Sequence, residues 1–391
     1  MITLSRHVWK ALPEAMVRGS VPGALLTALC LILFALPGCG DSSPILVGFS
    51  GQLTGKVSDM GVGGRNGALL AVEHINKAGG VNGRPLKLVA EDDGNTAEGA
   101  LAADTALIDA GVVAIIGHMT SSQSMAALPY VNESGIILIS PTTSTPLLTG
   151  IKDNFTRVMV ENPVQSRALA TYARTILDIR TIASIMETDN LSYSMTFEET
   201  FTSVFEQLGG TFLSSFAYSA SGATNWTAIM AELQRLNPDA ILLTCPAQDF
   251  VTLAQNIRSS GITARLFSGA WAYTDKLLLW GGRDIEGSIF VIDFASDNPS
   301  PAFTSFIKAY ETRFGSSPNF ASAFAYESVL ALANGLKKTD GSSEGLLAAM
   351  TSGERIQGVT GSFSLDEYGD VTREVFIVTV RDGSFRTVGI R

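Results

Sequence analysis

The sequence predicts an α/β fold of two doubly wound parallel-sheet lobes, joined where the chain crosses between them three times. Its 391 residues are too many for one ordinary hydrophobic core, so two lobes are expected. With 46% hydrophobic and 16% charged residues, the composition excludes a disordered chain and is typical of well-buried sheets. Apolar runs alternate with amphipathic stretches, first from residue 45 and again from residue 155, which indicates strands covered by helices on both faces.

The first set of alternating elements follows a short polar linker. Apolar runs rich in β-branched residues predict its strands, and apolar residues at helical spacing, such as Leu69, Val72 and Ile75, predict its helices. In chain order we expect strand 45–50, helix 61–78, strand 85–93, helix 95–110, strand 112–117, helix 121–134 and strand 136–140.

The same alternation then restarts and predicts a second sheet. In chain order we expect strand 155–159, helix 163–178, strand 181–187, helix 194–208, strand 211–218, helix 224–236, strand 240–245, helix 248–260, strands 265–269 and 288–293, helices 301–314 and 320–337, and strands near 361–364 and 375–380. The crossings are expected near residues 160, 295 and 370. They divide the chain into a first lobe of residues 45–160 and 296–370 and a second lobe of residues 161–295 and 371–391.

The N-terminus has the pattern of a secretory signal. Arg6, Lys10 and Arg18 form a basic region, and the apolar residues 21–38 follow it. Cys39 and a polar stretch come next. A basic flank, an apolar region and small residues before a break are typical of a signal peptide rather than of a folded element.

The residues around Cys39 suggest how this signal is processed. Leu36-Pro37-Gly38-Cys39 resembles the lipobox of bacterial lipoproteins, in which the cysteine becomes the lipid-modified first residue. We therefore expect a signal peptide at residues 1–38, lipid attachment at Cys39 and a tether over residues 39–44. An uncleaved anchor helix is the alternative. Both interpretations place the rest of the chain outside the cytoplasm and tethered to a membrane.

Charge and cysteine content narrow the range of partners. Residues 1–38 hold three basic residues and one acidic residue, so the remaining chain has 24 Lys and Arg against 36 Asp and Glu, a net charge of −12. Such an acidic surface disfavours nucleic acid as a partner. Cys245 is the only cysteine after Cys39, so no disulfide can form within the mature domain.

Two predicted strands each end in a loop rich in hydroxyl groups. The third strand continues into IIGHMTSSQS (115–124), and the fourth is followed by PTTSTP (141–146). Ligands of open α/β sheets bind beyond the carboxyl ends of the strands, where helix N-termini offer N–H groups to a carboxylate. The candidate ligand contacts in these loops are Ser121, Thr142, Thr143 and Ser144. Ordinary N-capping is the alternative, although one cap needs only one hydroxyl.

Five segments carry a resemblance to a known family. They are GQLTGKVSDMGVGGRNGALLAVEHINKAGGVNGRPLKLVAEDDG (51–94), IIGHMTSSQS, ILISPTTSTPLLT (137–149), FGSSPNFASAFAYESVLALANGL (314–336) and GVTGSFSLDEYGD (358–370). Together they resemble the leucine/isoleucine/valine-type solute-binding proteins, the type I periplasmic binding proteins of branched-chain amino-acid ABC transporters. The resemblance covers essentially the whole mature chain. It implies two lobes on a three-stranded hinge that close on a small ligand.

The resemblance also implies roles for individual residues. Ser121 matches the serine that holds the ligand carboxylate, and the loop at Thr142–Ser144 matches one that assists it. Tyr193 matches a second-lobe tyrosine that faces the cleft. Trp271 stands where amino-acid binders carry the glutamate that grips the α-ammonium group, and it offers an aromatic face instead. Packing between the lobes is the alternative for Trp271.

The absence of that glutamate changes which ligand we expect the protein to bind. A buried ammonium group without a carboxylate partner is costly, so the usual mode of binding an α-amino acid is disfavoured. Asp189 or Glu327 could supply a replacement acid. A first-lobe aromatic residue of the family aligns with Met60. We expect recognition of a carboxylate to be retained and recognition of an ammonium group to be changed.

The sequence lacks the patterns expected of an enzyme. After residue 38 it contains only two histidines, His74 in the first predicted helix and His118 in the loop before Ser121. A hydrolase elbow, a metalloprotease motif and a phosphate-binding loop are all missing from the sequence. We therefore expect no catalysis, no cofactor and no metal, and interpret His118 as support for the Ser121 loop.

These observations predict an extracytoplasmic solute-binding lipoprotein of an ABC importer. It would be a monomer in the periplasm or at the cell surface, lipid-anchored to the bacterial membrane, and would deliver a small carboxylate-bearing solute to an ABC permease. The solute would be an amino acid or an aromatic or apolar carboxylate. A ligand-sensing or envelope-enzyme-regulating lipoprotein with the same fold and no transport role is the alternative.

Overall fold

The computed structural model describes residues 43–55, 57–220 and 222–390. Its first sheet has the strand order β2-β1-β3-β4-β5, and all of its neighbouring strands are parallel. The strands are β1 (Ile45–Gly51), β2 (Leu86–Asp92), β3 (Ala114–Ile116), β4 (Ile137–Ser140) and β5 (Phe155–Arg157). The predicted signal peptide and the predicted lipid attachment at Cys39 lie outside the described residues.

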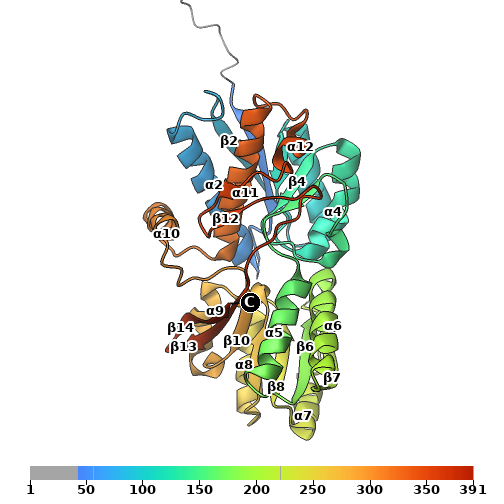
Figure 1. The fold of residues 1–391 in the computed structure, drawn as a ribbon. Helices are drawn as coiled ribbons and strands as arrows, with labels where there is room; N and C mark the ends of the chain where they lie inside the picture. The colour runs from blue at the N-terminus through green and yellow to red at the C-terminus, as the bar shows by residue number, and fades with distance from the viewer. Residues whose placement is uncertain (1–42, 56, 221, 391) are drawn as a thin grey trace, which may run out of the picture. The chain divides into compact units, whose positions relative to one another are not determined.

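Helices cover both faces of the first sheet (Figure 1). Helices α2 (Ser58–Lys77) and α11 (Phe320–Lys338) cover one face, and α3 (Ala97–Asp109) and α4 (Ser121–Ser134) cover the other. Helix α10 (Pro301–Phe314) packs on α2, and α12 (Leu346–Met350) packs on α11. Alternate residues of β3 face opposite sides: Ala114 and Ile116 belong to the core under α2 and α11, and Ile115 packs with α3 and α4. Burial on both faces explains why these strands are continuous apolar runs. We call the β1–β5 sheet and these helices the first lobe.

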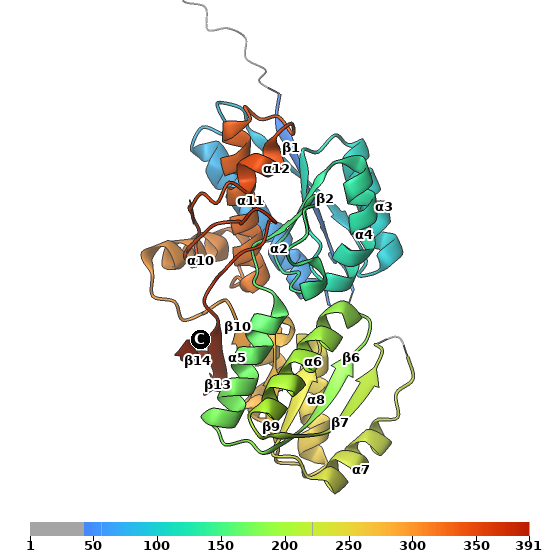
Figure 2. The same ribbon diagram turned by 45° about the vertical axis from the view of Figure 1, so that its right-hand side comes forward.

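The second sheet has the strand order β14-β13-β10-β9-β8-β6-β7. Its strands are β6 (Thr181–Glu187), β7 (Thr211–Tyr218), β8 (Ala240–Thr244), β9 (Arg265–Ser268), β10 (Ile289–Ile292), β13 (Phe376–Arg381) and β14 (Ser384–Ile390). Its helices are α5 (Asn162–Thr175), α6 (Leu191–Gln207), α7 (Trp226–Leu236), α8 (Ala247–Ser259) and α9 (Asp275–Gly281). Figure 2 shows α5 and α6 lying together along this sheet. We call this unit the second lobe.

The predicted α/β fold of two parallel-sheet lobes is confirmed, with one addition at an edge. The strands from β10 to β7 are parallel, but β13 runs antiparallel to β10, and β14 forms a hairpin with β13. Asp382 and Gly383 form the hairpin turn with φ values of 52° and 67°. An Asp-Gly pair is the usual sequence signal for such a turn, and it marks the strand that the sequence analysis missed.

The chain passes between the two sheets three times, after β5, after β10 and after the short strand β12 (Ser362–Phe363), which pairs with β11 (Ile356–Gln357). Buried polar contacts tie these passages together. Asp293 accepts the Val160 N–H at 3.0 Å, and the Arg157 guanidinium contacts Asp370 at 2.7 Å. Burial is the main cause that raises the pKa of Asp293 to about 6. The residues from Ser43 onward form one compact unit.

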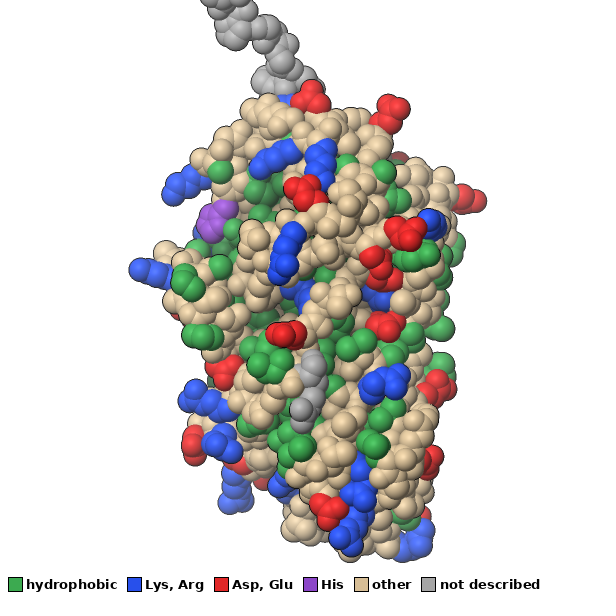
Figure 3. All heavy atoms as spheres, in the orientation of Figure 1, with side chains coloured by type: hydrophobic (Ala, Val, Ile, Leu, Met, Phe, Trp, Pro, Cys, Tyr) green, Lys and Arg blue, Asp and Glu red, His purple; other side chains and the backbone are tan. Residues whose placement is uncertain are grey.

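Charged side chains of both signs are mixed over the face shown in Figure 3. On that face the described residues give a phosphate backbone no continuous basic surface to follow. Across residues 43–390, apart from 56 and 221, no helix is long and apolar enough to cross a bilayer.

Candidate functional site

A small cavity lies where the two lobes face each other. Its cavity volume is about 20 Å³. The first lobe contributes loop residues that follow β3 and β4, and the second lobe contributes the start of α6 and the turn after β9. The lining residues are Met60, Met119, Thr120, Ser121, Thr142, Ser144, Met159, Asn190, Tyr193, Ala270, Trp271 and Phe320.

A buried ionic cluster around His118 supports the two hydroxyl-rich loops. His118 contacts Asp93 at 3.0 Å and Asp104 at 3.1 Å, and all three side chains are fully buried. Burial alone would lower the pKa of His118, but the charges and hydrogen bonds of Asp104 and Asp93 outweigh it and raise this pKa to about 9. The imidazole is therefore a cation at neutral pH, fixed between two carboxylates.

Ser140, the last residue of β4, connects this support to the second loop. Its hydroxyl donates to the His118 carbonyl at 2.9 Å and accepts the N–H groups of Thr142 and Thr143 at 3.3 and 2.9 Å. These bonds fix the direction in which the chain leaves the sheet. The hydrogen bonds of Ser140 therefore fix the conformation of the loop after β4.

The structure places most of the predicted first-lobe contacts at the cavity. Ser121 accepts the Ser144 N–H at 3.3 Å, which joins the two loops. Thr142 also lines the cavity, but its hydroxyl donates to the Met119 carbonyl at 2.7 Å. Thr143 does not line it, because its hydroxyl turns inward to Ser124 at 2.7 Å.

Tyr193 and Trp271 line the cavity from the second lobe. Their rings meet edge to face, with centroids 5.8 Å apart. Tyr193 is 4% exposed and Trp271 is 6% exposed. Burial raises the pKa of Tyr193, so its phenol stays protonated and can donate a hydrogen bond.

Four buried polar atoms at this cavity have no hydrogen-bond partner within the described part of the chain. They are Thr120 Oγ1, Ser144 Oγ, Tyr193 Oη and Trp271 Nε1, of which Tyr193 Oη also lies near the backbone of Ala270 and Trp271. Thr120 is the residue before α4, but its side chain does not cap that helix. Because an unpaired buried polar group is costly, four around one cavity indicate a site built to hold a polar molecule.

The cavity lining contains no acidic side chain among the residues described. The two acids considered as replacements lie elsewhere. Glu327 is fully buried against Arg373, with 2.6 Å between Oε2 and Nη2. Asp189 accepts the Ser219 hydroxyl at 2.7 Å and the Ala220 N–H at 3.2 Å. The three methionines and Phe320 make the remaining wall largely apolar.

Asn190 is a site residue that sequence reasoning missed. Its amide oxygen accepts the Ser122 N–H from the other lobe at 3.1 Å, and the Ser122 hydroxyl accepts the Ser192 N–H at 3.4 Å. Glu187 holds this turn by accepting the Asn190 N–H at 3.1 Å, and burial raises the pKa of Glu187 to about 7. A polar Asp-Asn pair before a helix could have signalled a cap, but not a contact between lobes.

The opposite rim of the cavity is also bridged. The Thr274 hydroxyl of the second lobe donates to Asp59 of the first lobe at 2.8 Å, and Lys276 Nζ lies 3.9 Å from the same carboxylate. Within the described ranges, no group of three or more His, Cys, Asp or Glu side chains could hold a metal ion. The arrangement offers hydrogen bonds and enclosure, which suit binding.

Comparisons with known proteins agree with this geometry. A family model described as periplasmic binding protein matches residues 44–384. A leucine-, isoleucine-, valine-, threonine- and alanine-binding protein of Pseudomonas aeruginosa is 24% identical over 339 residues, covering 85% of this chain and 89% of the relative.

Two solved structures show the same fold. The branched-chain amino acid transporter substrate-binding protein LivJ of Streptococcus pneumoniae, in complex with isoleucine, has a TM-score of 0.81 at 22% identity and covers 88% of this chain and 99% of its own. An ABC transporter solute-binding protein of R. palustris, in complex with benzoate, has a TM-score of 0.81 at 19% identity, with coverage of 89% and 96%. The resemblance seen in the sequence is thereby confirmed.

Proposed function

This chain belongs to the periplasmic binding protein family, and we propose that it is the solute-binding protein of an ABC importer. In this proposal its two lobes, residues 45–160 with 296–370 and residues 161–295 with 371–391, close on a small solute that carries a carboxylate. The observation that carries the proposal is the cavity between the lobes, with its four unpaired buried polar atoms. A ligand that bridges groups of both lobes stabilises the closed arrangement.

Recognition of a carboxylate is assigned to the first lobe. Thr120 and Ser121 stand at the N-terminus of α4, where backbone N–H groups and the helix dipole favour an anion. Ser144, in the loop after β4, lines the cavity beside them and donates its N–H to Ser121. Thr142 shapes the same wall. Thr143 acts through Ser124 and leaves the direct contacts to its neighbours.

The second lobe is assigned to the body of the solute. Tyr193 can donate a hydrogen bond, and the Trp271 ring covers an apolar or aromatic group. With no acid among the described lining residues to pair with an ammonium group, we favour a carboxylate without an α-amino group. Isoleucine and benzoate, the ligands in the two solved relatives, both carry a carboxylate, and only isoleucine carries an ammonium group.

The location and the partner follow from the same proposal. A signal peptide at residues 1–38 and a lipid on Cys39 would hold the protein outside the cytoplasm, and an ABC permease would receive the solute. The protein would act by binding alone, without catalysis. Metabolic labelling of the expressed protein with a palmitate analogue tests the anchor, and Cys39→Ser should abolish the label.

A thermal-shift screen tests the binding proposal. The panel holds benzoate, aliphatic carboxylates, isoleucine, aromatic amino acids and benzamide. At about a hundred times its dissociation constant, a bound ligand adds about 2.7 kcal/mol of stability. We expect carboxylates without an ammonium group to raise the melting temperature. If no carboxylate shifts the folded, ligand-free protein, the proposal is wrong.

A further inference from the structure

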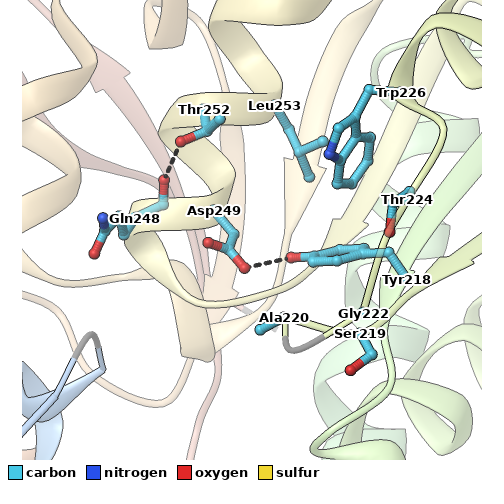
Figure 4. Close-up of a pocket in the computed structure, with 10 residues that line it drawn as sticks. All are labelled: Tyr218, Ser219, Ala220, Gly222, Thr224, Trp226, Gln248, Asp249, Thr252 and Leu253. Carbon is cyan, nitrogen blue, oxygen red and sulfur yellow. Dashed lines mark hydrogen bonds between the residues drawn. The ribbon is translucent and has the colours of Figure 1, made fainter.

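A second pocket, with lining residues of its own, lies in the second lobe. It opens at the carboxyl end of β7 and beside the first turns of α7 and α8 (Figure 4). Its volume is about 180 Å³. The two pockets share no lining residue, so this one needs an explanation of its own.

Two aromatic rings form one side of the pocket. Tyr218 ends β7 and Trp226 begins α7, and their rings meet edge to face with centroids 5.0 Å apart. Figure 4 shows both rings turned toward the space in front of α8. The faces of such rings carry negative electrostatic potential and attract cations.

A carboxylate stands opposite these rings. Asp249, in the first turn of α8, is 6% exposed and accepts the Tyr218 hydroxyl at 2.7 Å. Burial is the main cause that raises the pKa of Tyr218, so the phenol remains a donor and holds the carboxylate in place. The pocket therefore presents a fixed acid beside two aromatic rings.

The surroundings add negative charge. Asp189 accepts hydrogen bonds from Ser219 and Ala220, two residues that line the pocket. The described lining residues include no Lys and no Arg. Leu253 supplies an apolar wall beside the indole, and Thr252 lies one helical turn from Gln248. An anion that entered the pocket would meet the Asp249 carboxylate.

From this combination we propose that the pocket is a second binding site, specific for a small organic cation such as a quaternary ammonium ion. The aromatic faces of Tyr218 and Trp226 contact the alkyl groups, and Asp249 supplies the charge. The site is separate from the carboxylate site between the lobes and does not depend on the function proposed for it.

Isothermal titration of the purified full-length chain with choline chloride tests this site. The neutral isostere 3,3-dimethyl-1-butanol has the same shape and lacks the charge. We expect one choline to bind per chain and the alcohol to bind at least about tenfold more weakly, because the attraction between a cation and an aromatic face requires the charge. Equal affinity for the two molecules, or no binding of choline by the folded protein, would overturn the proposal.

Variants locate the site. Asp249→Asn keeps the acceptor for Tyr218, and Trp226→Leu keeps an apolar side chain; each should weaken choline binding at least about tenfold. The matched control is Trp280→Leu, because Trp280 lies on α9 at 42% exposure, outside both pockets, and this variant should bind choline as the wild type does.

Two measurements distinguish this proposal from a purely structural role of Asp249 and from choline binding in the cavity between the lobes. If Asp249 only stabilises α8, Asp249→Asn will lower the melting temperature and Trp226→Leu will leave choline affinity unchanged, which overturns the site. Competitive displacement of choline by saturating benzoate would place choline in the cavity between the lobes and would also overturn it. Independent binding of the two probes supports two separate sites.

Discussion

Replacing Ser144 by alanine tests whether this residue serves ligand binding or the stability of the fold. Ser144 is 1% exposed, lines the cavity, and its hydroxyl has no partner within the described chain. An unpaired buried hydroxyl costs about 1–3 kcal/mol. Without ligand, Ser144→Ala should therefore leave the free energy of unfolding unchanged or raise it by up to about 1 kcal/mol.

The same substitution should weaken ligand binding. A hydrogen bond to a charged group contributes about 1.5–3 kcal/mol, which corresponds to roughly a 10- to 150-fold rise in the dissociation constant for a carboxylate. Calorimetric titration with a carboxylate found in the thermal-shift screen measures the loss. Urea unfolding of the ligand-free protein measures the stability.

Ser140→Ala is the matched control, four residues earlier in the chain. Ser140 is also fully buried, but its hydroxyl makes three hydrogen bonds to the backbone. Its loss should lower the free energy of unfolding by at least about 2 kcal/mol. If Ser144→Ala is destabilised like this control and binds the carboxylate with unchanged affinity, the assignment of Ser144 to the site is refuted.

Three further predictions follow from the same structure. The pKa of His118 is raised to about 9 in the folded state, against a reference value of 6.5. Its contribution to stability is therefore complete below about pH 6.5 and is lost as the pH rises to about 9, a change of about 3 kcal/mol in the free energy of unfolding. An imidazole NMR titration that gives a pKa near 6.5 would contradict this prediction. Trp271→Ala should weaken binding of aromatic carboxylates more than that of aliphatic ones, and an equal loss in calorimetry would indicate packing between the lobes instead. Glu327→Gln leaves the buried Arg373 without its ion-pair partner and should lower the free energy of unfolding in urea by about 3 kcal/mol. The affinity for a carboxylate ligand should stay unchanged. A loss of ligand affinity without a loss of stability would place Glu327 in the binding site.

The sheets and most helices could be predicted because local patterns determine them. The strands are apolar runs buried on both faces, and α4 and α10 begin and end at the expected residues. Strand β14 was missed because this outer strand of the edge hairpin is half exposed and lacks a continuous apolar run. Helix α9 was missed because its seven residues are too few to show a helical period.

Only part of the site could be predicted from the sequence. The hydroxyl clusters pointed to Ser121 and Ser144, and the family resemblance pointed to Tyr193 and Trp271. The sequence could not show that Thr143 turns inward to Ser124, because that depends on which side of the loop each hydroxyl takes. Nor could it show that Asn190 reaches the other lobe, since the contact depends on how the two lobes pack.

The central claim is that the cavity between the lobes recognises a carboxylate without requiring an ammonium group. Calorimetric titration of the wild-type protein with benzoate and with benzamide, its neutral analogue of nearly the same shape, tests it most directly, with isoleucine as the third ligand. The account predicts that benzoate binds and that benzamide binds at least about tenfold more weakly, because the hydroxyl and N–H donors at α4 face an anion. Binding of isoleucine alone, or of benzamide as tightly as benzoate, would contradict it.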